Sequence, residues 1–249
     1  MKRDDLNLGK ILMLAAAVAC ISGLAGFALN ADDVLEESAK EVRLDLAFVT
    51  HLDMNLHEQD VYIERQINSG EVYRVTAGDH DMNAPLYASA TKVPHDPFNP
   101  ESVGPFPKGR SLNLTLGQWL RQTGQGSYTY KDGVGRLALN FSGLVPNGVY
   151  TMWHAFMPAT PPVPFTGTLD LPLGASDGSE SRFTADEHGQ ASFVHTFRPG
   201  LEMSDVWTVS MLAINYHSDG KTYGGHPGLF GLHSHIPLFA MLPQRGGIE

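Results

Sequence analysis

The stretch that decides the fold is SYTYKDGVGRLALNF, residues 127–141. Two runs of β-favouring residues flank Lys131-Asp132-Gly133, and Asp-Gly between such runs is typical of a tight turn that joins antiparallel strands. Outward from this hairpin, similar runs recur between turn signals such as Pro146-Asn147-Gly148 and Glu187-His188-Gly189. The expected strands lie near residues 127–130, 134–141, 148–156, 181–184, 191–197, 206–216 and 235–241. The predicted fold is mainly β, an antiparallel, Greek-key-like β-sandwich over residues 111–249.

Composition supports a turn-rich globular chain and excludes several functions. The 249 residues include 26 Gly and 16 Pro, and the 42% hydrophobic content is sufficient for a core. The net charge of −10 excludes nucleic acid as a partner, because phosphate contacts require the opposite sign. Cys20 is the only cysteine, so the rest of the chain has no disulfide and no cysteine ligand for a blue-copper or zinc site.

The N-terminal segment predicts export. Residues 11–31, ILMLAAAVACISGLAGFALNA, carry no charge. Small residues near the end of this segment are typical of a signal peptide, whereas its length suits a membrane span. Residues 1–31 are therefore either a signal peptide or an N-terminal membrane anchor. Basic residues before the segment and Asp32-Asp33 after it place the N-terminus in the cytoplasm. We expect the rest of the chain on the periplasmic side of the cell envelope, anchored in the inner membrane or secreted.

Residues 32–70 are predicted to form one long amphipathic helix. Apolar residues recur at every seventh position, namely Leu35, Val42, Val49, Leu56 and Ile63. A stripe this narrow requires a partner, which is another subunit, a membrane protein or the chain's own sheet. We therefore expect residues 33–69 to bind a protein partner or to mediate self-association.

Residues 71–110 are predicted to form an extended, proline-rich arm. Two short strands are expected in EVYRVTAG (71–78) and PLYASATKV (85–93). Residues 94–109 contain five prolines, which fix φ and remove backbone donors. A short helix with Thr115 as its N-cap and Trp119 facing inward follows the arm. The insertion at residues 158–181 is expected to be a long loop of the kind that often carries binding.

One sequence motif resembles a known group of proteins. In GLVPNGVYTMWHAF (143–156), a Gly-Leu-x-Pro turn leads into a Tyr-x-x-Trp strand, which resembles secreted bacterial β-sandwich modules. The loop HSDGKTYG (217–224) is similar to a feature of the same modules. The turn also resembles one in copper/zinc superoxide dismutases, where two metal histidines follow at alternate positions. Here only His154 follows, so the resemblance does not imply dismutase activity.

The stretch 215–239 contains four of the 11 histidines. If its flanking strands pair antiparallel, His217 lies opposite His233 or His235, with Cβ atoms about 5 Å apart. Such nitrogen-rich sets without sulfur suit Cu(II) or Zn(II), and an open coordination position permits water activation or redox chemistry. The expected metal ligands are His217, His233, His235, His226 and Asp219, with His95 and His154 as candidates outside the loop. The alternative is that these side chains only fix turns through backbone hydrogen bonds.

Three functions are consistent with these patterns. The leading hypothesis is a binding or accessory protein of the cell envelope with copper or zinc as a ligand. The alternative is a metal-dependent redox or hydrolytic enzyme of the envelope. A serine hydrolase has the weakest support, because the neighbours His217, Ser218 and Asp219 cannot converge as a triad and no Gly-x-Ser-x-Gly motif is present.

Overall fold

The computed structural model describes residues 41–94 and 96–245. The predicted signal or anchor at residues 1–31, the first part of the predicted helix and His95 lie outside the described residues. None of the helices in the described ranges combines the length and the hydrophobicity that a membrane-spanning helix requires.

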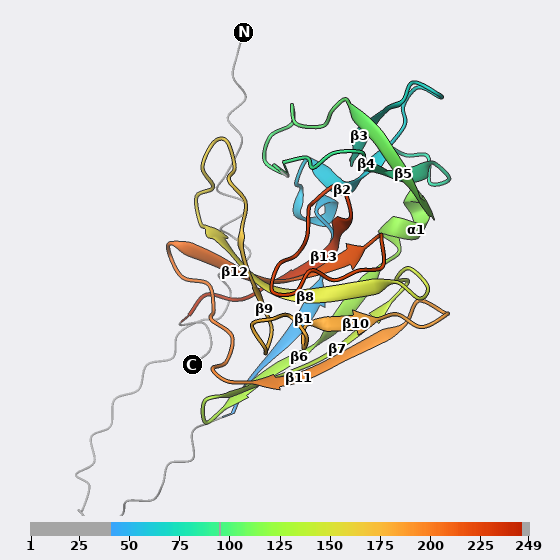
Figure 1. Cartoon of the computed structure of the whole chain (residues 1–249). Helices are drawn as coiled ribbons and strands as arrows, with labels where there is room; N and C mark the ends of the chain where they lie inside the picture. The colour runs from blue at the N-terminus through green and yellow to red at the C-terminus, as the bar shows by residue number, and fades with distance from the viewer. Residues whose placement is uncertain (1–40, 95, 246–249) are drawn as a thin grey trace, which may run out of the picture.

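Two antiparallel sheets form a sandwich, which is the larger part of the fold (Figure 1). The first sheet has the order β1-β6-β7-β11. Its strands are β1 (Val42–Phe48), β6 (Thr123–Lys131), β7 (Val134–Ser142) and β11 (Ala191–Phe197). The second sheet has the order β10-β8-β12-β13, with β9 also paired to β8. Its strands are β8 (Val149–Pro158), β9 (Leu169–Pro172), β10 (Arg182–Thr184), β12 (Thr208–His217) and β13 (Ser234–Met241).

The hairpin β6–β7 forms because its turn residues tolerate positive φ. Lys131 pairs with Val134, and the two residues between them, Asp132 and Gly133, have φ values of 49° and 79°. A two-residue turn with positive φ at both positions matches the twist of the flanking strands. The turn fixes a register in which Leu137, Leu139 and Phe141 all face the core.

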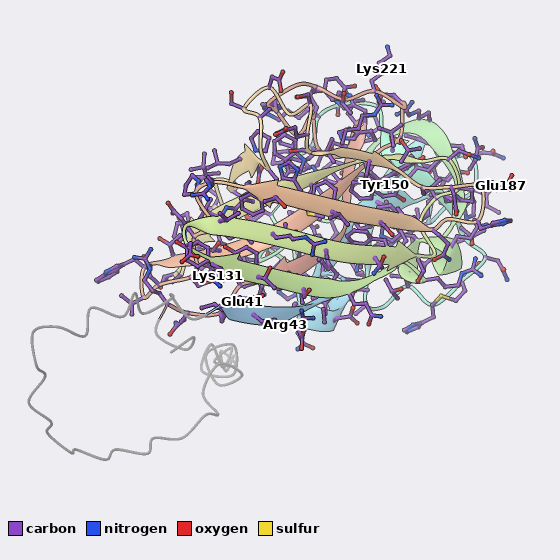
Figure 2. All side chains as sticks on the ribbon, turned by 90° about the horizontal axis from the view of Figure 1, so that it is seen from below. Glu41, Arg43, Lys131, Tyr150, Glu187 and Lys221 are labelled. Atoms are coloured by element: carbon purple, nitrogen blue, oxygen red, sulfur yellow. The ribbon has the colours of Figure 1, made fainter. Side chains whose placement is uncertain are left out.

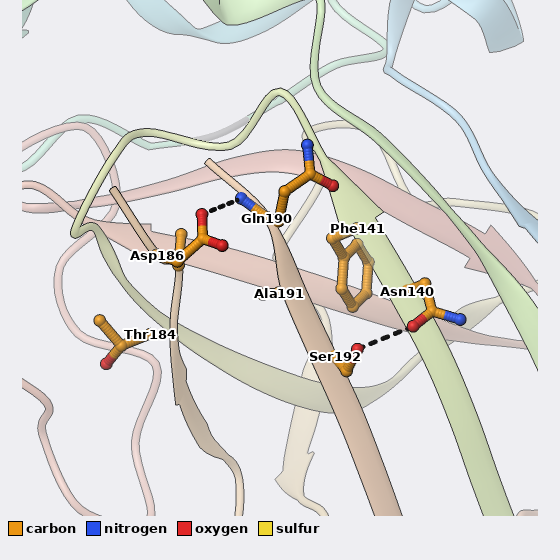
Figure 3. A pocket seen from close by; sticks show the side chains of 8 residues that line it. Asn140, Phe141, Thr184, Asp186, Gln190, Ala191 and Ser192 are labelled. Atoms are coloured by element: carbon orange, nitrogen blue, oxygen red, sulfur yellow. Dashed lines mark hydrogen bonds between the residues drawn. The ribbon is translucent and has the colours of Figure 1, made fainter. Parts of the chain in front are cut away.

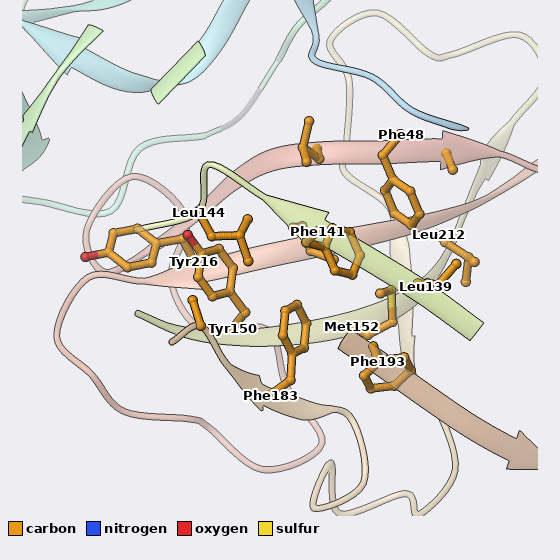
Figure 4. Packing of buried hydrophobic residues seen from close by; sticks show 14 of the residues in the cluster. Phe48, Leu139, Phe141, Leu144, Tyr150, Met152, Phe183, Phe193, Leu212 and Tyr216 are labelled. Carbon is orange, nitrogen blue, oxygen red and sulfur yellow. The ribbon is translucent and has the colours of Figure 1, made fainter. Parts of the chain in front are cut away.

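An aromatic core joins the two sheets (Figure 4). Phe183 stacks on Phe141 and on Tyr150, with ring centroids 5.4 Å and 5.5 Å away. Phe48 packs edge-on against Phe141 at 5.1 Å. Each fully buried side chain of this kind contributes about 1.5–3 kcal/mol, so these contacts account for much of the cohesion between the sheets.

A small closed barrel packs beside the sandwich (Figure 1). Its order is β2-β3-β5-β4, and the strands are β2 (Glu58–Ile63), β3 (Glu71–Thr76), β4 (Pro85–Ser89) and β5 (Phe106–Thr115). Helix α1 (Leu116–Leu120) leads from the barrel back to the sandwich. Thr115 caps this helix through Gln118 in a reciprocal capping box, and Trp119 is buried.

A buried ionic cluster lies where the barrel meets the sandwich. Glu58, Asp60 and Arg74 are all 0% exposed. Arg74 donates to Asp60 Oδ1 at 2.9 Å, its Nε lies 3.3 Å from Glu58 Oε1, and it also donates to the Pro94 carbonyl at 2.8 Å. Burial raises the pKa of Glu58 to about 8 and that of Asp60 to about 6, despite the opposing charge of Arg74. At neutral pH we therefore expect one ion pair, Arg74–Asp60, and a protonated Glu58.

The structure confirms the mainly β fold with antiparallel sheets, and all seven expected strands of the sandwich are present. The insertion predicted as a loop, residues 158–181, contains one unexpected strand, β9. The N-cap at Thr115 and the two short strands at 71–76 and 85–89 are also confirmed.

The helix predicted for residues 32–70 is wrong over its described part. Residues 42–48 and 58–63 are strands, with only a 3₁₀ turn (Leu52–Met54) between them. Strand side chains alternate with period two, so positions seven residues apart do not share a face. Val49 and Leu56 pack against the outer apolar cluster around Phe239, and Ile63 is buried. Leu35 lies outside the described residues.

The arm predicted for residues 71–110 is also wrong in its conformation. Residues 71–76, 85–89 and 106–115 are strands of the barrel, and the prolines lie mainly in the connection before β5. Pro107 is the second residue of β5 and pairs with Glu71 of β3. A missing backbone donor is tolerated at the start of a strand.

Replacement of Arg74 tests the role of the buried cluster. Arg74→Met leaves two carboxyl groups in an apolar site, so the free energy of unfolding should fall by about 3–5 kcal/mol in chemical denaturation. Arg65→Met is the matched control, because Arg65 forms a partly exposed ion pair with Asp79. That change should cost less than about 1 kcal/mol. Equal losses in the two variants would contradict the role assigned to Arg74.

Candidate functional site

The histidine loop, defined here as residues 217–235, connects β12 to β13 at one end of the second sheet. The two strands pair antiparallel, as the sequence predicts. The prediction that His217 lies opposite His233 or His235 is wrong. His217 lies opposite Ser234, and Tyr216 lies opposite His235. An irregularity between Ile214 and Tyr216 shifts the register by one residue. Because a shift of one moves side chains to the other face, His217 and His235 project from opposite faces of the sheet.

His235 faces the barrel and is fully buried. Its Nδ1 lies 2.9 Å from the backbone carbonyl oxygen of Asp60, and its Nε2 lies 3.0 Å from Ser218 Oγ. A carbonyl can only accept, so Nδ1 carries the proton and Nε2 accepts from the Ser218 hydroxyl. Burial lowers the pKa of His235 to about 3, which keeps the ring neutral.

Ser218 lies between this imidazole and a guanidinium. Arg110, an exposed residue of β5, donates to Ser218 Oγ at 2.6 Å. The Ser218 backbone N–H donates to the His233 carbonyl at 2.9 Å, which fixes the start of the loop. Ser218 itself is partly exposed. The site therefore combines an accessible hydroxyl, a neutral base that accepts its proton and a cation on its other side.

His217 occupies the opposite face, under the loop. Its Nε2 lies 2.8 Å from Thr151 Oγ1, which also accepts from Trp153 Nε1 at 2.7 Å. Its Nδ1 is buried and has no hydrogen-bond partner. Burial lowers the pKa of His217 to about 4, so the ring is neutral at physiological pH. A buried ring nitrogen without a partner costs free energy unless a further group binds it.

The other expected ligands are engaged in folding the loop. Tyr223 stacks on His233 with ring centroids 4.3 Å apart, and its hydroxyl donates to Asp219. His233 Nε2 accepts from the Leu229 N–H at 2.9 Å, and His226 Nδ1 accepts from the Gly228 N–H at 3.0 Å. These bonds correspond to the turn chemistry that the sequence offered as the alternative to metal binding.

The loop therefore brings the expected ligands together only in part. Tyr223 contacts three of them, His217, Asp219 and His233, whereas His235 projects from the other face of the sheet. No group of three His, Cys, Asp or Glu side chains arranged to hold a metal ion occurs in residues 41–94 and 96–245. His154 lies apart in the interior, bonded to Ser210 Oγ at 2.8 Å.

Two surface depressions lie away from the histidine loop. One, of about 490 Å³, lies beside Asn140, Phe141, Asp186, Gln190 and Ser192 (Figure 3). In it, Asp186 accepts from the Gln190 N–H and Asn140 accepts from Ser192, so its polar groups largely satisfy one another. The other, of about 390 Å³, lies between the 3₁₀ turn and the end of β3.

Sequence reasoning missed Asp60 and Arg110 as parts of the site. The sequence predicts a helix around Asp60 and an extended arm around Arg110, although both residues lie in barrel strands. One available signal was the alternation of Glu58, Asp60 and Tyr62 at every second position, which is the period of a strand. Their contact with a loop more than a hundred residues later is not visible in any local pattern.

Comparison of the chain with profiles of known protein families, with curated protein sequences and with solved structures finds no match.

The pH dependence of unfolding tests the buried, neutral His217. The pKa of His217 is about 4 in the folded protein, below the ordinary value of 6.5. The neutral ring therefore contributes its full share to the free energy of unfolding above pH 6.5, and this share is lost as the pH falls towards 4. Relative to His217→Gln, the free energy of unfolding of the wild type should fall by about 1.4 kcal/mol for each pH unit between pH 6.5 and 4. Chemical denaturation at several pH values measures the difference. His188→Gln, at an exposed site, is the control and should follow the wild type.

Proposed function

We propose that the protein is a hydrolase of the cell envelope that acts on carboxylic esters through Ser218. The observation that carries the proposal is the hydrogen bond from Ser218 Oγ to the neutral Nε2 of His235, whose Nδ1–H is held by the Asp60 carbonyl. This arrangement contains a nucleophile, a base and a group that orients the base. The uncharged segment at residues 11–31 supports export or membrane anchoring.

The reaction would proceed through an acyl-enzyme. Ser218 Oγ attacks the ester carbonyl carbon, and its proton passes to His235 Nε2. The guanidinium of Arg110 lies beside the same oxygen and can stabilise the negative charge that develops on the carbonyl oxygen. The alcohol then leaves with the proton from His235. Water, deprotonated by the same imidazole, releases the acid and restores the hydroxyl of Ser218.

His235 is a weak base, because burial lowers its pKa to about 3, and this limits the expected rate. The carboxylate of Asp60 is engaged by Arg74 and by the Ile236 N–H, so only its backbone carbonyl reaches the imidazole. We therefore expect slow turnover, and stoichiometric acylation of Ser218 is the more sensitive measurement.

Covalent labelling tests this function. The full-length protein should react with a fluorophosphonate probe, which forms a bond from Ser218 Oγ to phosphorus as fluoride leaves. Ser218→Ala should abolish the label and His235→Gln should slow labelling by at least about 10²-fold, as expected for loss of a general base. Ser192→Ala, at an exposed serine of the sandwich, should be labelled like the wild type. Undiminished labelling of Ser218→Ala, or none of the wild type, would exclude the proposed nucleophile.

A second candidate function is binding of copper or zinc at His217. The unpartnered, neutral Nδ1 of His217 favours it, because a metal ligand must be unprotonated. Asp219 and His233 lie in the same loop, but the loop must rearrange to bring both to one ion. The predicted role as an accessory protein rested on an apolar stripe along a helix. In the described residues this stripe lies in strands and turns, so it no longer supports a partner-binding helix.

Metal content after dialysis distinguishes this second function. Wild type equilibrated with Cu(II) or Zn(II) should retain about one ion per chain, and His217→Gln should retain none because the first ligand is lost. His188→Gln should behave as the wild type. No retained metal in the wild type would leave His217 as a structural residue of the loop.

A further inference from the structure

An exposed apolar pair occupies the tip of the turn before β12. Val206 is 71% exposed and Trp207 is 79% exposed. The tips of tight turns usually carry Gly, Asn, Asp, Ser or Pro, which suit the backbone and solvent. Two large apolar side chains at this position are therefore unusual for a surface that meets only water.

Hydrogen bonds fix the backbone of this turn. The Asp205 backbone N–H donates to the Thr208 carbonyl at 2.8 Å, and the Asp205 carboxylate accepts from the N–H groups of Trp207 and Thr208 at 2.7 Å and 2.6 Å. Ser204, which precedes the turn, donates through its hydroxyl to the Leu242 carbonyl and through its backbone N–H to the Pro243 carbonyl, directly after β13. The backbone that carries Val206 and Trp207 is thus ordered before any contact with a partner, which lowers the entropic cost of binding.

The pair lies at the end of the sandwich where the N-terminal segment enters. Val42, the first residue of β1, pairs with Tyr130 beside the β6–β7 turn. Arg198, at the start of the connection that leads to β12, donates to the Asp132 carbonyl in that turn at 3.3 Å. Figure 2 shows Glu41 and Lys131 at one end of the sandwich and Glu187 at the other. Figure 1 shows the turn before β12 on the same side of the molecule as the start of β1.

Chain length limits how far this end can lie from a membrane. Only residues 32–41 separate the uncharged segment 11–31 from β1. Ten residues span at most about 35 Å even when fully extended. A membrane that holds residues 11–31 would therefore lie within reach of the end that carries Trp207.

We propose that Val206 and Trp207 contact the headgroup region of the membrane in which residues 11–31 are anchored. Tryptophan is enriched at this depth because its ring is apolar and its indole N–H can bond to polar groups. The net charge of −10 disfavours anionic lipid, so zwitterionic lipid is the expected surface. The inference rests on the membrane-anchor part of the proposed function and is independent of Ser218.

Tryptophan fluorescence can test the contact because the chain has three tryptophans and two are buried. Trp119 and Trp153 are each 1% exposed, so a quencher in the lipid reaches Trp207 alone. The full-length protein is reconstituted into phosphatidylcholine vesicles with bromine close to the headgroups. If the three tryptophans emit equally, quenching of Trp207 should lower the total emission of the wild type by up to one third. Trp207→Ser should show no such loss, and Val194→Ser, which alters another exposed apolar residue, should be quenched like the wild type.

The outcomes separate the two proposals. Full-length protein that does not associate with the vesicles would overturn both the anchor and the contact. Protein that associates but shows equal emission in brominated and ordinary lipid would overturn the contact and leave the anchor standing. Esterase labelling of Ser218 is unaffected in either case.

Discussion

The interaction on which the rest of the structure depends is the buried contact between Arg74 and Asp60. Three oxygens of Asp60 accept hydrogen bonds. Its Oδ1 accepts from Arg74, its Oδ2 from the Ile236 N–H, and its backbone carbonyl from His235. The first bond belongs to the barrel and the other two reach β13 of the sandwich. Because a buried carboxylate is costly without partners, this residue fixes the two parts in one relative position, and with them the imidazole that faces Ser218.

A single irregularity in β12 divides the histidine loop between two environments. Without the shift between Ile214 and Tyr216, the pairing that begins with Met211 and Met241 would place His217 opposite His235. With it, His235 turns towards the barrel and Asp60, and His217 turns towards Thr151. The hydroxyl chemistry proposed for Ser218 and the unpartnered nitrogen of His217 thus arise from the same local shift, because a strand changes face with every residue.

The proposed site and the proposed membrane contact lie at opposite ends of one strand. β12 begins at Thr208, directly after Trp207, and ends at His217, directly before Ser218. Ten residues in a strand extend for about 33 Å. If Trp207 touches the headgroups, Ser218 faces away from the membrane towards the surrounding compartment. Soluble or envelope-bound esters could then reach it without entering the bilayer.

The sequence alone determined seven strands of the sandwich, the Asp132-Gly133 turn and the Thr115 cap, because each depends on residues close together in the chain. It also determined the uncharged segment that predicts export. It predicted a helix where β1 and β2 are strands, because apolar residues there happen to recur at helical spacing and β2 carries buried polar residues. It also predicted an extended arm where β3, β4 and β5 close a small barrel. The contacts of Ser218 with His235 and Arg110, and of His235 with Asp60, were decided by tertiary structure. Their partners lie up to 175 residues apart, and a one-residue shift in pairing selects which side chains meet.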